Sequence, residues 1–146
     1  MDSMNKFYII FNMNKILLLL SFLTNSYSQS LTCNDFKEGK FIVPSNKIIP
    51  KEHYIIREGN NQTEYVEESG QELLIYGAIE WIDNCSYIIK FDGSKMELTD
   101  DLKFINENGG IVTSLLNIEG RCFFYKSVLV IEEKEVYRFD GQFCKE

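Results

Sequence analysis

The stretch QELLIYGAIEWIDNCSYIIKFD, residues 71–92, decides the fold class. Two runs within it alternate apolar and polar residues, and a period of two is the pattern of half-buried β-strands. Both runs are also rich in β-branched and aromatic residues. The sequence therefore predicts an antiparallel hairpin, with Asp83 and Asn84 in its turn.

The turn of this hairpin can be inferred from the positions of the apolar residues. A two-residue turn would oppose the apolar face of one strand to the polar face of the other, whereas a three-residue turn at residues 82–84 keeps the apolar faces together. This register pairs Trp81 with Cys85, and Ile79 with Tyr87.

Short apolar runs separated by turn residues continue on both sides of the hairpin. In the second hairpin, a turn at Asn60 and Asn61 would place Arg57 opposite Glu64. One short helix is predicted within residues 92–110, with Ser94 or Thr99 at its N-terminus. Further strands are expected at residues 36–43, 54–58, 62–67, 111–118, 122–130 and 136–140.

These elements predict an all-β fold, an antiparallel meander of about seven or eight strands. The meander would close into a small barrel or form a strongly curled sheet, with at most one short helix. A β-sandwich of two sheets is the alternative.

Residues 1–28 have the features of a secretory signal peptide. Positive charge at Lys6 and Lys15 accompanies an apolar core at residues 16–23, and small residues precede Gln29. The apolar core is shorter than the ~20 residues that span a membrane. Translation could begin at Met1, Met4 or Met13. We therefore expect a secreted or periplasmic protein with a single β domain at residues 29–146.

The charge of the chain restricts its partners. The net charge is −7, and residues 1–28 contain two lysines and one aspartate, so residues 29–146 carry −8. Nucleic acids and anionic membrane surfaces attract Lys and Arg patches. The sequence therefore predicts neither of these partners, and no membrane span; we expect a monomer.

Four cysteines follow the signal peptide, and an even count in an exported chain predicts disulfides. Three connectivities are possible. A three-residue turn at residues 132–134 would bring Cys122 opposite Cys144 and Phe123 opposite Phe143. This register favours the Cys122–Cys144 disulfide and leaves Cys33 to pair with Cys85. The single histidine and the absence of a C-x-x-C motif argue against a metal site.

Five segments of the chain have a familiar spacing: Cys33-x-x-Phe36-x-x-Gly39-x-Phe41, Ile55-Ile56-Arg57, Gln62-x-Glu64, Ile79-x-Trp81-x-x-x-Cys85-x-Tyr87 and Ile118-x-Gly120. Together they resemble small secreted proteins of unknown function from Bacteroidetes-type bacteria, which sometimes carry a DNA topoisomerase IV label. The resemblance implies no catalytic residues, and it implies that Cys33 and Cys85 are the pair shared with that group. The Gly39-x-Phe41 triplet and the meander are also similar to lipocalin-like barrels.

The candidate chemistry favours binding over catalysis. His53 has no nucleophile beside it in the sequence and is expected to be an exposed loop residue. Glu72 and Glu80 share one strand face and would not flank a cleft as the two carboxylates of a glycosidase do. We therefore expect a non-enzymatic domain without a cofactor, and a hydrolase is the least favoured alternative.

The preferred hypothesis is a site for a small apolar ligand inside the curled sheet. Its predicted residues are Trp81, Tyr87, Phe91 and Arg57. The alternative is a cell-surface or periplasmic module that binds a protein through an edge strand or the aromatic residues 123–125.

Overall fold

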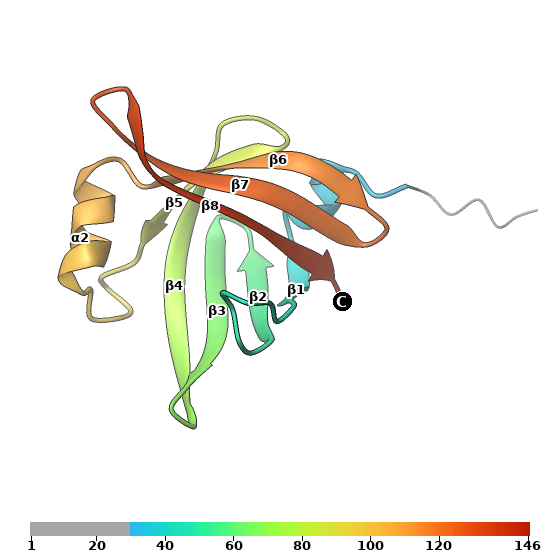
Figure 1. The fold of residues 1–146 in the computed structure, drawn as a ribbon, viewed down its shortest axis with the longest axis horizontal. Coiled ribbons are helices and arrows are strands. Elements are labelled where there is room, and N and C mark those ends of the chain that lie inside the picture. The colour runs from blue at the N-terminus through green and yellow to red at the C-terminus, as the bar shows by residue number, and fades with distance from the viewer. Residues whose placement is uncertain (1–29) are drawn as a thin grey trace, which may run out of the picture. The chain divides into compact units, whose positions relative to one another are not determined.

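The computed structural model describes residues 30–146, so the predicted signal peptide lies outside the described residues. The fold is a closed antiparallel barrel of eight strands in sequence order, which confirms the all-β prediction (Figure 1). The barrel belongs to the compact unit Leu31–Glu146. Its elements are η1 (Cys33–Phe36, a 3-10 helix), β1 (Gly39–Val43), β2 (His53–Glu58), β3 (Asn61–Glu68), β4 (Gln71–Trp81), β5 (Ser86–Phe91), α2 (Asp100–Glu107), β6 (Ile111–Glu119), β7 (Cys122–Ile131) and β8 (Lys134–Lys145).

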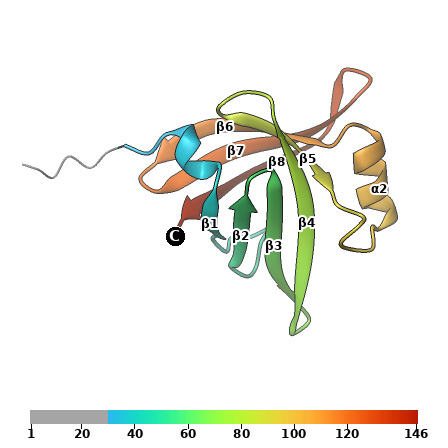
Figure 2. The same cartoon turned by 180° about the vertical axis from the view of Figure 1, so that it is seen from behind.

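Because each strand is antiparallel to the next, the connections alternate between two ends of the barrel. We call the end with η1 and the connections at residues 59–60, 82–85 and 120–121 the closed end. The other end, which we call the open end, has α2 and the connections at residues 44–52, 69–70, 92–110 and 132–133. Figures 1 and 2 show η1 and α2 on opposite sides of the barrel.

The closed end is filled by η1. Phe36 is 1% exposed. Its ring centroid lies 5.2 Å from that of Phe123 and 5.9 Å from those of Phe41 and Phe143. The main core cluster of the barrel is built around these four rings. Burial of apolar side chains such as these rings is the main source of stability in a small domain.

The prediction of a strand over residues 36–43 is wrong in its first part, because residues 33–36 form η1. The start of η1 is fixed by Asp35. The Oδ2 of Asp35 accepts hydrogen bonds from the backbone N and the Oγ1 of Thr32, at 2.8 and 2.9 Å. These bonds lower the pKa of the Asp35 carboxyl. The chain then enters β1 at Gly39, where φ is 121°, a value that L residues rarely adopt.

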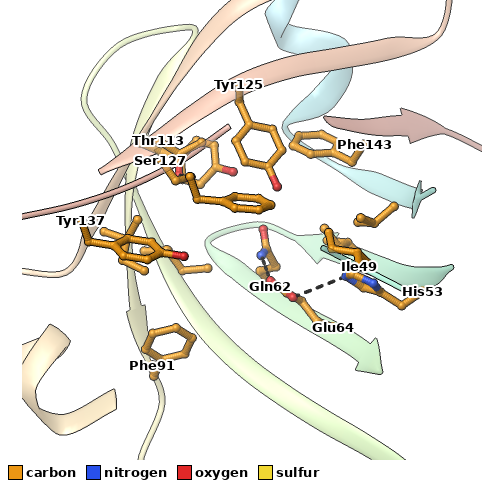
Figure 3. A pocket seen from close by; sticks show the side chains of 16 residues that line it. Ile49, His53, Gln62, Glu64, Phe91, Thr113, Tyr125, Ser127, Tyr137 and Phe143 are labelled. Carbon is orange, nitrogen blue, oxygen red and sulfur yellow. Dashed lines mark hydrogen bonds and ion pairs between the residues drawn. The ribbon is translucent and has the colours of Figure 1, made fainter. Parts of the chain in front are cut away.

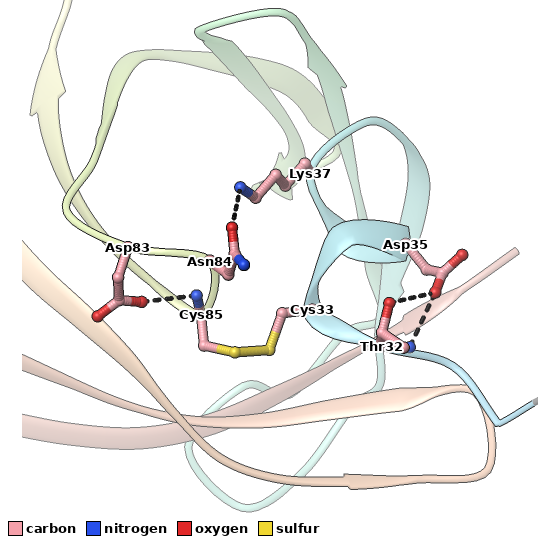
Figure 4. Close-up of a disulfide and its surroundings, with 7 residues drawn as sticks. All are labelled: Thr32, Cys33, Asp35, Lys37, Asp83, Asn84 and Cys85. Atoms are coloured by element: carbon pink, nitrogen blue, oxygen red, sulfur yellow. Dashed lines mark hydrogen bonds between the residues drawn. A yellow bond between two sulfur atoms is a disulfide. The ribbon is translucent and has the colours of Figure 1, made fainter.

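Both predicted disulfides are present, Cys33–Cys85 and Cys122–Cys144. The first joins η1 to the loop between β4 and β5 (Figure 4). Lys37 Nζ also donates to Asn84 Oδ1 in this loop, at 3.3 Å. The second disulfide joins the start of β7 to the end of β8. Both covalent links therefore reinforce the closed end.

The predicted pairing of β4 with β5 is displaced by two residues. Trp81 pairs with Tyr87, and Gly77 with Phe91. The residues between β4 and β5 form a longer loop, in which the backbone N of Cys85 donates to Asp83 Oδ1 at 2.6 Å. Cys85 lies in this loop, outside both strands, and forms the disulfide with Cys33. A shift of two residues keeps the apolar face inward.

The two other predicted hairpin turns also differ from the structure. The β2–β3 turn uses residues 59–60, so Arg57 pairs with Gln62 and not with Glu64. The β7–β8 turn has two residues, Glu132 and Glu133, both with positive φ. An irregularity next to Leu129 shifts the register by one residue. The predicted pairing of Cys122 with Cys144, at the closed end of this hairpin, is therefore correct.

The predicted helix forms as α2. Thr99 is its N-cap, and its side chain accepts a hydrogen bond from the backbone N of Leu102 at 3.3 Å. Asn106 fastens the helix to β5: its Oδ1 accepts from the backbone N of Phe91, and its Nδ2 donates to the Phe91 carbonyl, both at 2.8 Å. The helix therefore flanks the open end, and none of its residues is buried.

Candidate functional site

A cavity of about 220 Å³ lies inside the barrel, on the open-end side of the main core (Figure 3). Its walls combine aromatic and aliphatic side chains with a few polar ones, as small-molecule sites do. Sixteen residues from seven of the eight strands and the β1–β2 loop line it: Val43, Ile49, His53, Ile55, Gln62, Glu64, Tyr87, Ile89, Phe91, Ile111, Thr113, Tyr125, Ser127, Tyr137, Phe139 and Phe143.

The polar part of the wall is built from β2 and β3. Gln62 Nε2 donates a hydrogen bond to Glu64 Oε1 at 2.7 Å. Glu64 Oε2 lies 3.8 Å from His53 Nε2, which is farther than a hydrogen bond reaches. In Figure 3 the three side chains lie together on one side of the cavity. Glu64 is the only carboxylate among the lining residues, and no Lys or Arg is among them.

Hydroxyl groups form a second polar region on β6 and β7. Thr113 Oγ1 and Ser127 Oγ are 2.7 Å apart and share a hydrogen bond. Tyr125 points from β7 into the cavity. Burial raises the pKa of its phenol well above the ordinary value, so this hydroxyl keeps its proton at neutral pH.

Arg57 lies beneath the cavity, on its closed-end side, and is 1% exposed. Its guanidinium donates three hydrogen bonds: Nε to Gln62 Oε1 at 2.8 Å, Nη1 to the Phe36 carbonyl at 2.9 Å, and Nη2 to Tyr87 Oη at 2.5 Å. The ring centroids of Tyr87 and Phe143 lie 4.6 and 4.7 Å from its Cζ. Arg57 thus connects η1 to the polar wall through Gln62.

The structure brings two of the four predicted ligand residues to the cavity, Tyr87 and Phe91. Trp81 does not line it, but its ring packs edge-on against Tyr87 with centroids 5.1 Å apart. Arg57 contacts lining residues from below without lining the cavity itself. Strand alternation therefore identified two of the six aromatic residues that line the cavity; the other four, Tyr125, Tyr137, Phe139 and Phe143, were not predicted ligand residues.

The prediction that His53 is an exposed loop residue is wrong. His53 begins β2, and its side chain is 12% exposed in the cavity wall. The sequence carries one signal that could have indicated this position: His53, Ile55 and Arg57 have the spacing of residues on one strand face. A strand that begins one residue earlier would have placed all three inside the barrel.

The other candidate residues lie away from the cavity. Glu72 and Glu80 are exposed on β4, and Phe124 is half-buried and does not line the cavity. Within residues 30–146, no group of three or more His, Cys, Asp or Glu side chains is placed to hold a metal ion. In the same part of the chain, none of the helices has the length and apolar character needed to cross a membrane.

Apolar side chains are exposed in the segments near the open end. Tyr137, which lines the cavity, is 54% exposed. Ile48 in the β1–β2 loop is 74% exposed.

Comparisons with protein-family models, with curated proteins and with solved structures give no match for this chain.

Proposed function

We propose that this protein binds a small, mainly apolar organic molecule in the barrel cavity. The cavity itself is the observation that carries the proposal. Its volume of about 220 Å³ lies between the ~150 Å³ that holds benzene and the ~300–1,000 Å³ of larger ligand sites. A ligand with one ring and a short chain would fit this space.

The lining residues support binding better than they support catalysis. A glycosidase needs two carboxyl groups that flank the bond it breaks, and Glu64 is the only carboxylate among the described residues that line the cavity. A serine-type nucleophile needs a base in hydrogen-bond contact. Thr113 and Ser127 instead bond each other, and the nearest charged neighbour of His53 is Glu64. We therefore propose a binding protein without enzymatic activity.

We also propose that the protein works outside the cytoplasm, either secreted or in a periplasm. Two disulfides link its closed end, and such bonds persist in oxidising compartments. The signal-peptide features of residues 1–28 support the same location. A carrier or scavenger of a small molecule is the role that this combination favours.

Calorimetric titration of oxidised residues 29–146 with single-ring compounds tests the binding proposal. The reference compound is 2-phenylethanol, and bound ligand should also raise the melting temperature. Ile111→Phe adds bulk to the cavity wall and should weaken binding at least about tenfold. Ile82→Phe is the control, because Ile82 is 55% exposed at the closed end and should leave the affinity unchanged.

The absence of binding by every compound of the panel at millimolar concentration would overturn the proposal. Equal weakening by Ile111→Phe and Ile82→Phe would also contradict it, because the ligand would then bind elsewhere. If binding is confirmed, native mass spectrometry of the protein purified from its host gives the mass of the natural ligand.

A further inference from the structure

We propose that the natural ligand is a small organic ammonium ion with an aromatic or compact apolar body, and that Glu64 is its counterion. This inference rests on the proposed function and adds the chemical class of the ligand. Four features carry it: the position of Glu64, the burial of Arg57, the aromatic walls, and the charge of the domain.

Glu64 is held in place with one oxygen left for a ligand. Its Oε1 accepts the hydrogen bond from Gln62 Nε2 at 2.7 Å, and Gln62 is itself oriented by the bond it accepts from Arg57 Nε. Its Oε2 accepts no hydrogen bond from the described residues, and it lies 3.8 Å from His53 Nε2. A ligand ammonium can therefore donate to Oε2 from inside the cavity.

An anionic ligand would find no Lys or Arg among the described residues of the cavity wall, and His53, the one histidine there, lies beside Glu64. Arg57, beneath the cavity, is 1% exposed, and each of its three nitrogens donates to a protein acceptor. The rings of Tyr87 and Phe143 cover it at 4.6 and 4.7 Å. An incoming carboxylate would have to displace Tyr87 to reach it, whereas an ammonium would meet Glu64 directly.

The rings that do not cover Arg57 suit a cation with an apolar body. Phe91, Tyr125, Tyr137 and Phe139 contribute to the cavity wall. Aromatic faces attract ammonium groups through the ring quadrupole, and the same rings pack against an aromatic ligand. The net charge of −8 over residues 29–146 also favours the approach of a cation.

Three ligands of similar size and different charge test this inference: 2-phenylethylammonium, 2-phenylethanol and 3-phenylpropionate. Calorimetry on oxidised residues 29–146 should give the order ammonium, alcohol, carboxylate, from tightest to weakest. Glu64→Gln keeps the shape of the side chain and should weaken ammonium binding about 10- to 100-fold, because a charge-assisted hydrogen bond is lost. The same variant should weaken binding of the alcohol much less than binding of the ammonium, because no ligand charge is left unpaired.

Two further variants control the result. Glu64→Asp keeps the charge and should keep the preference for the ammonium. Glu80→Gln removes a carboxylate that is exposed on β4 and does not line the cavity, so it should change no affinity.

The outcomes separate this inference from the proposed function. Alcohol binding with no preference for the ammonium, or with tighter binding of the carboxylate, would overturn the ammonium class and keep the binding function. An ammonium preference that survives Glu64→Gln would overturn the role of Glu64. Failure of all three compounds to bind would overturn both proposals.

Discussion

The two ends of the barrel differ in how they are held together. At the closed end, Phe36 is 1% exposed, Arg57 bonds its carbonyl, and both disulfides lie nearby. At the open end, α2 has no buried residue, and Tyr137, which lines the cavity, is 54% exposed. The strongest links therefore lie away from the cavity. Substitutions at the two ends should separate effects on stability from effects on binding, and the predictions below test that separation.

The largest effect is expected at the aromatic core of the closed end. Phe36→Ala should lower the free energy of unfolding by about 3–5 kcal/mol, because it leaves a cavity among buried rings. Phe104→Ala on α2, where Phe104 is 50% exposed, should cost less than about 1 kcal/mol. Urea unfolding of the oxidised protein measures both. Similar losses in the free energy of unfolding for the two variants would show that the closed end is not more important for stability than the open end.

The disulfides should contribute unequally. The Cys33–Cys85 bond closes a sequence separation of 52 residues, and the Cys122–Cys144 bond one of 22. The chain-entropy model gives about 4 and about 3 kcal/mol respectively. Replacing both cysteines of a pair by alanine, followed by urea unfolding, tests this order. A greater loss in the free energy of unfolding on removal of the Cys122–Cys144 bond would contradict this order. It would show that the link from η1 to the barrel contributes less to stability than the link between β7 and β8.

Gly141 should connect stability with the cavity. A Cβ atom at this position would lie 2.6 Å from Tyr125 Oη and 2.7 Å from Phe139 Cε1. Both rings line the cavity, so Gly141→Ala should cost about 1–3 kcal/mol and should also weaken binding of 2-phenylethanol.

Gly93→Ala is the matched control for this prediction. Its added Cβ would meet only the side chain of Leu98, at 3.0 Å, and Gly93 does not line the cavity. Thermal unfolding and calorimetry of the two variants give the comparison. Unchanged ligand affinity in Gly141→Ala would mean that the rings of Tyr125 and Phe139 do not shape the ligand site.

The smallest effect is expected in the alkaline range. Burial raises the pKa of Tyr125, so the neutral phenol stabilises the fold. This contribution is complete below the ordinary tyrosine pKa of about 10 and is lost as pH rises above it, by at most about 1.4 kcal/mol per pH unit. As the pH rises above about 10, the free energy of unfolding should therefore fall less for Tyr125→Phe than for the wild type, as measured by urea unfolding at each pH. Parallel curves for the two proteins would contradict the burial of this hydroxyl.

Strand alternation predicted which residues face inward, and it predicted this better than it predicted register. In the β4–β5 hairpin the faces are correct although the pairing is displaced by two residues, because a shift of two preserves the faces. In the β7–β8 hairpin the pairing of Cys122 with Cys144 is correct although the predicted turn has one residue too many. The irregularity beside Leu129 offsets that error.

The polar half of the cavity could not be predicted in the same way. His53 and Glu64 meet because Tyr54 pairs with Tyr65. That register depends on a turn at residues 59–60, whereas the predicted turn lies at Asn60 and Asn61. The contact between Arg57 and the Phe36 carbonyl depends on η1 folding back over the barrel. A pattern of alternation within single strands does not contain this information.

Chemical-shift mapping of the ¹⁵N-labelled oxidised domain during titration with 2-phenylethanol tests the central claim most directly. The account predicts shifts in backbone amides of the cavity wall, at His53, Glu64, Phe91 and Ser127. Amides of the closed end, at Cys33, Asn84 and Arg121, should keep their positions. Shifts centred on the closed end or on the outer faces of the strands would contradict the assignment of binding to the open end.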